Sequence, residues 1–355
     1  MQDESKGYVP SSMADRIANA SIWWFAFGYF ACYVPYSLIA RAISRGWWWG
    51  TNGPMDGARL LPLSLMVSAV GMVIFLYATG LWRYAHQFKI GPLSIPRPSK
   101  GTFLSGLCTA TIIATTTLAY TFKGISIVFA MLLMRGGVLM IAPAVDMLSG
   151  RKARWFSWVG LFLSFLALVV AFWEPGGSTV LNTAVVVDIS LYLAAYFVRL
   201  RLMSSMAKSD DSSKQWQFFA EEQIVGVSAI MAFVVALAAL GWGSLGRELA
   251  QGFSLFDGGI VLVGVLLIGL FSQGTGIFGG LILLNKQENT FCVPVNRSSS
   301  ILAGVLASAL LTWFFNAPAP SPYKLAGAGL IIAAILVLSI PPLVERYQKR
   351  KAAKA

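Results

Sequence analysis

Two arginines lie inside apolar stretches that are each long enough to cross a membrane. Arg135 lies in the segment 127–145, and Arg297 lies in the segment 290–315. A guanidinium at that depth costs about 3 kcal/mol on membrane-insertion scales, so such residues rarely face lipid and usually serve a function. Each arginine is therefore interpreted either as the anchor of an anion-binding site or as a structural charge. The first interpretation predicts a phosphate or carboxylate held by bidentate, charge-assisted hydrogen bonds.

Polar side chains near the arginines are candidates to line a cavity. Asn296 and Ser298 flank Arg297 and supply an amide and a hydroxyl. A hydroxyl-rich stretch at 109–117 supplies threonines, whose alternative role is hydrogen bonding to their own helix. The predicted substrate-binding residues are Arg135, Arg297, Asn296, Ser298, Gln273, Thr111, Thr115, Tyr120 and Lys123.

The elements that position these residues follow from composition. The chain is 57% hydrophobic and 12% charged, with a mean hydropathy of +0.69, which is typical of a membrane protein. Apolar runs of about 20 residues, the length that spans a bilayer, recur along the whole chain. We expect an all-α polytopic membrane protein with ten transmembrane helices, at 21–40, 60–82, 102–122, 127–148, 155–173, 184–203, 218–240, 258–284, 290–315 and 324–343.

An internal repeat organises these spans. A shift of 162 residues places Arg135 on Arg297 and Phe129 on Phe291. Five spans per half is an odd number, so the second half must insert upside down relative to the first. Such inverted repeats place the substrate site near the membrane midplane, with roughly 8 Å of depth between the two arginines. The predicted organisation is an N-terminal cytoplasmic segment (1–20), two five-helix repeats (21–175 and 182–343) and a basic cytoplasmic tail (344–355).

The distribution of charge gives the expected orientation. The chain has 27 basic residues and a net charge of +12, and most basic residues fall in segments on one side of the predicted spans. The positive-inside rule then places both termini in the cytoplasm of a bacterial inner membrane. A nucleic-acid partner is not expected, because no folded basic face is available.

Acidic residues bear on the energy source of any transport. Asp146 lies near the predicted cytoplasmic end of its helix, where its role is interpreted as a salt bridge, a helix-end role or proton relay. Asp188, Glu221 and Glu222 open their predicted spans, so no carboxylate is expected in the middle of a span. This pattern favours exchange of one anion for another over proton coupling.

Motifs for other chemistry are missing or out of context. The three cysteines have no metal-ligand spacing, and the single His86 has no acidic neighbour in sequence. The segment 274–280, GTGIFGG, matches a dinucleotide-binding pattern but lies inside an apolar run, where small residues instead let helices approach closely. We expect neither an enzyme nor a cofactor or metal site.

Two segments resemble a known transporter family. Residues 134–172 and 295–311 are similar to the fourth-to-fifth and ninth spans of EamA-type members of the drug/metabolite transporter superfamily. The resemblance implies a ten-span transporter fold. In the branch that carries sugar phosphates and nucleotide sugars, basic residues of the ninth span bind phosphate, and Arg297 occupies a comparable place. The acidic residue usual in the four–five turn is replaced here by SGRKAR (149–154).

The expected function is secondary transport of a small anionic metabolite, bearing phosphate or carboxylate, or of a lipid-linked phosphate, by alternating access. The alternatives are a non-transporting membrane subunit or a lipid scramblase, in which the arginines would tie helices or guide headgroups. The expected partners are a small anionic substrate and membrane lipid, and the chain is expected to be a monomer or a homodimer.

Overall fold

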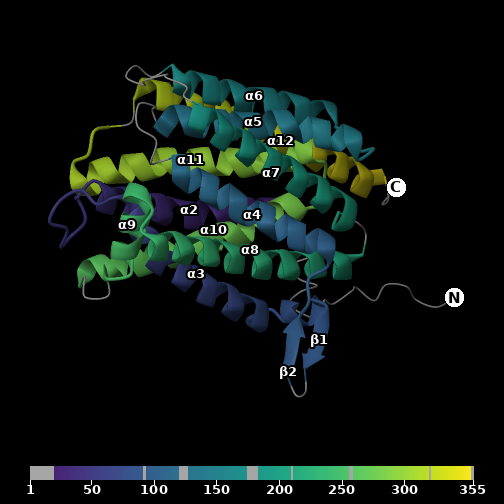
Figure 1. Cartoon of the computed structure of the whole chain (residues 1–355). Helices are drawn as coiled ribbons and strands as arrows, with labels where there is room; N and C mark the ends of the chain where they lie inside the picture. The colour runs from purple at the N-terminus through teal and green to yellow at the C-terminus, as the bar shows by residue number, and fades with distance from the viewer. Residues whose placement is uncertain are drawn as a thin grey trace.

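The computed structural model describes residues 20–90, 93–119, 127–173, 183–208, 211–255, 259–319 and 321–352. The chain is almost entirely helical, and Figure 1 shows its long helices lying roughly side by side. The elements are α2 (Ile22–Ser44), α3 (Gly57–Ala78), the 3-10 helix η1 (Leu81–Tyr84), β1 (Gln87–Ile90), β2 (Leu93–Pro96), α4 (Lys100–Ala119), α5 (Ile127–Leu148), α6 (Trp155–Phe172), α7 (Thr183–Met206), α8 (Ser212–Leu240), α9 (Gly243–Gly252), α10 (Ile260–Leu284), α11 (Asn289–Phe315) and α12 (Pro322–Ala352).

Each predicted apolar run coincides with one long helix of the structure. By length and composition, six helices of the described chain are long and apolar enough to cross a membrane, namely α2, α3, α7, α8, α10 and α11. Helices α6 and α12 contain shorter apolar stretches, Trp155–Val170 and Leu325–Pro341. The structure therefore supports an all-helical, multi-pass membrane architecture.

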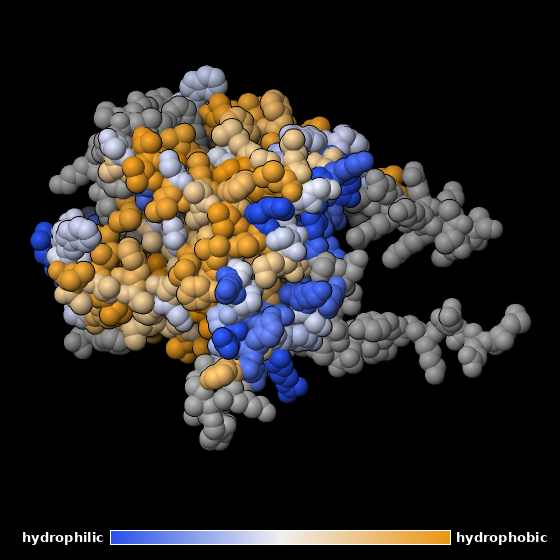
Figure 2. Space-filling view, turned by 45° about the vertical axis from the view of Figure 1, so that its right-hand side comes forward, coloured by the Kyte–Doolittle hydropathy of each residue, from blue (hydrophilic) through white to orange (hydrophobic). Residues whose placement is uncertain are grey.

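The surface has the character expected of a protein in lipid. Large apolar side chains such as Trp313, Tyr77 and Phe162 are strongly exposed, and Trp313 reaches 84% exposure. Figure 2 shows a broad hydrophobic area over the bundle, with hydrophilic residues gathered toward one end. An apolar area of this extent is unfavourable in water and favourable against acyl chains.

Small residues let the central helices approach closely. A Cβ added at Gly274 of α10 would lie 2.5 Å from Sγ of Cys32, and one added at Gly279 would lie 3.0 Å from Cε2 of Tyr29. Both contacts join α10 to α2, which it packs against closely. Gly274 and Gly279 of the segment 274–280 thus act in helix packing, as expected, whereas a Cβ at Gly276 would meet nothing within 4 Å.

A hairpin departs from the predicted all-helical fold. Strands β1 and β2 pair antiparallel, with Gln87 opposite Pro96 and Ile90 opposite Leu93, and the amide of Arg97 donates to the carbonyl of His86 at 2.7 Å. Figure 1 shows the hairpin at the end of the bundle where the C-terminus lies, and α9 at the opposite end. Strands of four residues carry too little periodicity to be read from sequence.

The start of α8 differs from prediction in a way that matters for the charges. Helix α8 begins at Ser212, where the Asp211 side chain accepts a hydrogen bond from the amide of Ser213 at 2.9 Å. Glu221 and Glu222 therefore lie in the third turn of α8 and not at its opening, so that prediction was wrong. The polar residues 212–217 extend the helix beyond the apolar run, because tertiary contacts and the cap outweigh hydropathy there.

The helices of the two predicted halves interlock. Helix α2 packs against α10 and α11, and α7 packs against α4 and α5. Helix α3 packs against α10, and α8 packs against α4, while α6 lies against α12 and α5 against α11. Each of the ten long helices therefore contacts a helix of the other predicted half.

Candidate functional site

Arg297 lies buried in α11, within a group of tyrosines. Arg297 is only 8% exposed. The guanidinium carbon lies 5.0 Å from the ring centroid of Tyr196, and Nη2 is 3.5 Å from the hydroxyl of Tyr192. Its Nε is buried and has no hydrogen-bond partner within the described chain. The guanidinium of Arg297 is thus held by an aromatic ring and a long hydroxyl contact, and its Nε–H can still donate a hydrogen bond.

Arg135 of α5 makes the corresponding contact with a tyrosine of the first half. Its Nη2 donates to the hydroxyl of Tyr33 at 3.0 Å. The Tyr33 ring lies 5.5 Å from that of Tyr29 and 5.6 Å from that of Tyr36, all on α2. The first half therefore supplies an arginine and aromatic residues, as the second half does.

The two arginines belong to one cluster. Tyr29, whose ring packs beside that of Tyr33, and Asn296, the chain neighbour of Arg297, approach the same point of α10, at 3.0 and 3.3 Å from a Cβ added at Gly279. No acidic side chain among the described residues forms an ion pair with Arg297. We call Arg135, Arg297, Tyr29, Tyr33, Tyr192 and Tyr196 the central Arg–Tyr cluster. Two cations among phenols, in a buried setting, are an arrangement that attracts an anion.

Three further predicted residues contact neighbouring helices, and of these only Asn296 approaches a residue that also contacts the cluster. Asn296 is buried, and its Nδ2 lies 3.3 Å from the position of a Cβ on Gly279 of α10. The Ser298 hydroxyl lies 3.3 Å from that of Ser164, which places it at the contact of α11 with α6. Gln273 donates to Sδ of Met72 at 3.4 Å, at the contact of α10 with α3.

The predicted threonines have hydroxyls that bond to their own helix. Thr111 donates to the carbonyl of Leu107 at 2.9 Å and is partly exposed. Thr115 is buried and donates to the carbonyl of Thr111 at 2.8 Å. This is the back-bonding arrangement that sequence analysis left open as an alternative. Tyr120 and Lys123 lie outside the described residues.

The tyrosines of the cluster were missed by sequence analysis, although a signal was present. The pattern Tyr-x-Ala-x-Tyr occurs at 29–33 and again at 192–196. The two copies are offset by 163 residues, within one position of the shift that aligns the arginines. On a helix, residues four apart share a face, so each copy presents both rings together. Searching the repeat shift for aromatic pairs would have found them.

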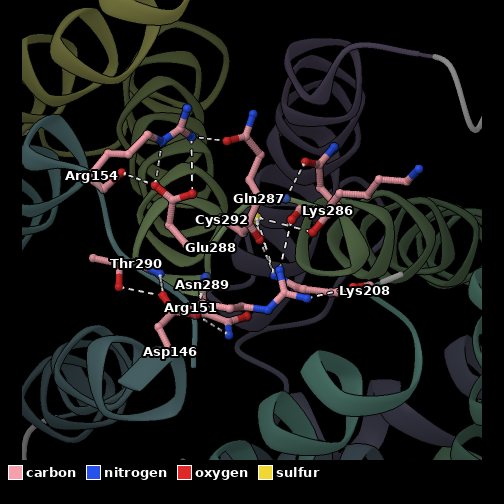
Figure 3. A network of polar contacts seen from close by, with 12 residues as sticks. Asp146, Arg151, Arg154, Lys208, Lys286, Gln287, Glu288, Asn289, Thr290 and Cys292 are labelled. Atoms are coloured by element: carbon pink, nitrogen blue, oxygen red, sulfur yellow. Dashed lines mark hydrogen bonds and ion pairs between the residues drawn. The ribbon is translucent and has the colours of Figure 1, made fainter. Parts of the chain in front are cut away.

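A second polar cluster closes the end of the bundle near the α5–α6 turn. We call residues 146–157, 204–208 and 285–292 the inner-end network, part of which is shown in Figure 3. Arg154 donates to both oxygens of Glu288, at 3.0 and 3.2 Å, and also to Gln287. Arg151 donates to the carbonyl of Lys208 at 2.7 Å. The SGRKAR segment forms the α5–α6 turn, and its Arg154 ties this turn to the α10–α11 turn.

Asp146 caps the N-terminus of the helix that carries Arg297. It accepts bonds from the amide and side-chain nitrogens of Asn289, at 2.9 and 2.8 Å. It also accepts from the amide and hydroxyl of Thr290, both at 2.7 Å. Four donors at a helix start are a structural cap. The structure therefore shows the helix-end role for Asp146.

The charged groups of this network respond to burial and to their partners. Burial raises the pKa of Glu288, but the hydrogen bonds from Arg154 and Ser157 outweigh it and hold that pKa below its ordinary value. Burial lowers the pKa of Lys208, whose ammonium donates to the carbonyl of Gln287 at 2.8 Å. Glu288 is therefore ionised at neutral pH and paired.

A buried ion pair joins α7 and α8. Arg199 donates to both carboxylate oxygens of Glu222, at 2.8 and 3.2 Å. The neighbouring Glu221 accepts from the backbone amides of His86 and Ser99, both at 3.0 Å, and ties the α3–α4 connection to α8. Both carboxylates lie within the helix that was predicted to carry none in its middle. Their partners lie on a different helix or in a distant connection, so sequence analysis could not identify the pairs.

Comparison with known proteins shows the fold and no family. No protein-family model and no curated protein sequence matches the chain. Among solved structures, a crystal structure of another protein superposes with a TM-score of 0.56 and 17% sequence identity. The match covers 92% of this chain and 99% of the other. At this identity the likeness concerns the fold alone, and it extends over almost the whole of both chains.

Proposed function

We propose that this chain is a secondary transporter that moves a small anionic metabolite, bearing phosphate or carboxylate, or a lipid-linked phosphate, by alternating access. The observation that carries the proposal is Arg297, a buried guanidinium held by Tyr192 and Tyr196 with an unpartnered Nε. A buried charge without a counter-ion is costly, and an arriving anion would supply the missing counter-ion and hydrogen-bond acceptors.

The proposal includes ten spans arranged as two inverted repeats, one covering α2–α6 and the other α7–α12 without α9. The pairing of helices supports it, because exchanging the halves reproduces the most extensive pairs. The α2–α10 contact becomes α7–α4, the α3–α10 contact becomes α8–α4, and the α2–α11 contact becomes α7–α5. Helices α6 with α12, and α5 with α11, then pair across the symmetry axis. Inverted repeats with a central site are a common architecture of secondary transporters.

Membership in the EamA-type family and a bacterial inner-membrane location are part of the same proposal. The unbalanced charge favours a carrier over a purely structural subunit, because a structural arginine would be expected to have a carboxylate partner, as Arg199 does.

A ligand screen tests the function. The purified protein is heated with inorganic phosphate, glycerol 3-phosphate, glucose 6-phosphate, succinate or citrate, and its apparent unfolding temperature is measured. A ligand that binds the native state raises this temperature. Arg297→Ala should abolish the shift, and Arg297→Lys should weaken it, since lysine keeps the charge but loses the bidentate fork. The exposed Arg247→Ala serves as the control and should keep the shift. An unchanged shift in Arg297→Ala would remove Arg297 from the site.

Orientation is tested by cysteine labelling in a background without native cysteines. Asn52 follows the first long helix, and Lys214 lies at the start of α8, where both are exposed. With cytoplasmic termini, a cysteine at 52 should react with an impermeant reagent from outside, and one at 214 only after the membrane is opened. The reverse pattern would invert the proposed orientation.

A further inference from the structure

One buried carboxylate stands apart from every other in the described chain. Asp188 lies in the second turn of α7 and is 6% exposed, and its Oδ2 has no hydrogen-bond partner among the described residues. By contrast, Asp146 accepts four hydrogen bonds and Glu222 is paired with Arg199. A carboxylate that is buried without partners binds a proton more readily than it stays charged.

Asp188 lies on α7, the helix that also carries Tyr192 and Tyr196 of the central Arg–Tyr cluster. Residues 188, 192 and 196 are four apart on α7, so they share one face of the helix. Tyr192 contacts Arg297, and the rings of Tyr192 and Tyr196 lie 4.9 Å apart. Along the backbone of α7, one helical turn, a rise of about 6 Å, therefore separates position 188 from position 192.

The arginines on helices around Asp188 form contacts with residues other than Asp188. Helix α7 packs against α4, α5, α8 and α10. Arg135 contacts Tyr33, and Arg199 is paired with Glu222. Helix α10 carries no charged residue. The charged and titratable side chains of the described residues on these helices are Lys100, Cys108, Arg135, Asp146, Lys214, Glu221 and Glu222, together with Tyr192, Tyr196, Arg199 and Arg201 on α7 itself.

We propose that Asp188 binds and releases the proton that couples anion movement to the proton gradient. This inference rests on the proposed transport function. A charged carboxylate on the same face of α7 as Tyr192 and Tyr196 disfavours a second negative group at the cluster, whereas the protonated form is neutral. Proton and anion therefore bind together, are carried in the same direction, and are released together on the other side. This changes the expectation from sequence, which favoured anion exchange.

Transport in proteoliposomes tests the coupling. Labelled inorganic phosphate and labelled succinate are the probes, and each is measured in self-exchange and in accumulation driven by a pH gradient. Asp188→Asn should keep self-exchange and lose accumulation by roughly tenfold, since the linkage is removed while the anion site remains. Asp188→Glu keeps a titratable group and should retain accumulation. The exposed cap variant Asp211→Asn is the control and should behave as the wild type.

Infrared spectroscopy of the purified protein tests the proton site without any substrate. Acidification should produce a carboxylic acid C=O band that is missing in Asp188→Asn and present in Asp211→Asn. A spectrum unchanged by Asp188→Asn overturns the inference, as does accumulation equal to wild type in that variant. Wild-type self-exchange without a response to the gradient also overturns it, while the transport function stands. If the wild type exchanges neither probe but the band is found, the transport function and the coupling fail and the proton site remains.

Discussion

Two buried arginines of this protein, Arg199 and Arg297, illustrate opposite uses of the same side chain. Both are almost fully buried in apolar helices. Arg199 donates to both oxygens of Glu222, so its charge is balanced within the fold. Arg297 lies over Tyr196, contacts Tyr192 and leaves its Nε without a partner. The balanced arginine joins two helices, and the unbalanced one retains the capacity to bind something that comes from outside.

The same contrast separates whole regions. In the inner-end network, Arg151, Arg154 and Lys208 all have carboxylate or carbonyl acceptors. In the central Arg–Tyr cluster, the groups around the arginines described above are phenols. Hydrogen-bonding capacity that is satisfied rigidifies a structure, and capacity left unsatisfied in a buried place calls for a functional explanation. Four predictions test this distinction, from the largest effect to the smallest.

The largest effect is expected from removing the balanced arginine. Arg199→Met leaves the Glu222 carboxylate buried and unpaired, which should lower the free energy of unfolding by about 3–5 kcal/mol. The matched variant Arg297→Met leaves no carboxylate behind and should change stability little, or raise it. Unfolding by SDS titration in mixed micelles measures both. Equal losses in the two variants would abolish the distinction between the arginines.

A smaller effect is expected at the paired Glu288. Glu288→Gln should lower the free energy of unfolding by about 1–3 kcal/mol at neutral pH, because Arg154 loses its charged partner. Since the folded-state pKa is depressed, the stabilisation is present above the unfolded value of about 4.3 and is lost as the pH falls through the folded value. The wild type should therefore lose more stability on acidification than Glu288→Gln does. Parallel pH curves would exclude Glu288 as the cause.

Coupling between the two central arginines is the third prediction. Arg135→Gln and Arg297→Gln should be non-additive in the affinity for the anion that gives the largest thermal shift. The expected interaction energy is about 0.5–3 kcal/mol, because both charges would act on one ligand. Titration calorimetry of the wild type, both single variants and the double variant measures it. Strict additivity would mean that Arg135 is structural and that only Arg297 anchors the anion.

The smallest effect is expected at the partly exposed ion pair between Arg59 and Glu248. Arg59 of α3 donates to Glu248 of α9 at 2.9 Å, with both side chains about 30% exposed. Solvent screens such a pair, so Glu248→Gln should cost only about 0.2–1 kcal/mol. The SDS titration used for Arg199→Met provides a direct comparison. A loss as large as that of Arg199→Met would show that burial does not govern the value of these pairs.

Much of the architecture was determined by local properties that sequence reports directly. Apolar runs of about 20 residues became the long helices, because a helix satisfies its own backbone hydrogen bonds wherever it lies. The burial of Arg297 followed from its place within such a run. The close approach of α10 to α2 followed from glycines, since a missing Cβ permits contact whatever the partner is.

Only the tertiary structure decided which side chains meet. Glu222 and Arg199 are close in sequence but lie on different helices, and Glu288 and Arg154 are 134 residues apart. The tyrosines beside the arginines come from α2 and α7, which no local rule connects to α5 or α11. The hydroxyls of Thr111 and Thr115 could either line a cavity or bond to their own helix, and in the structure both donate to carbonyls of α4. A charge in an apolar run can be recognised from sequence because its cost is local, but its partner depends on how distant helices pack.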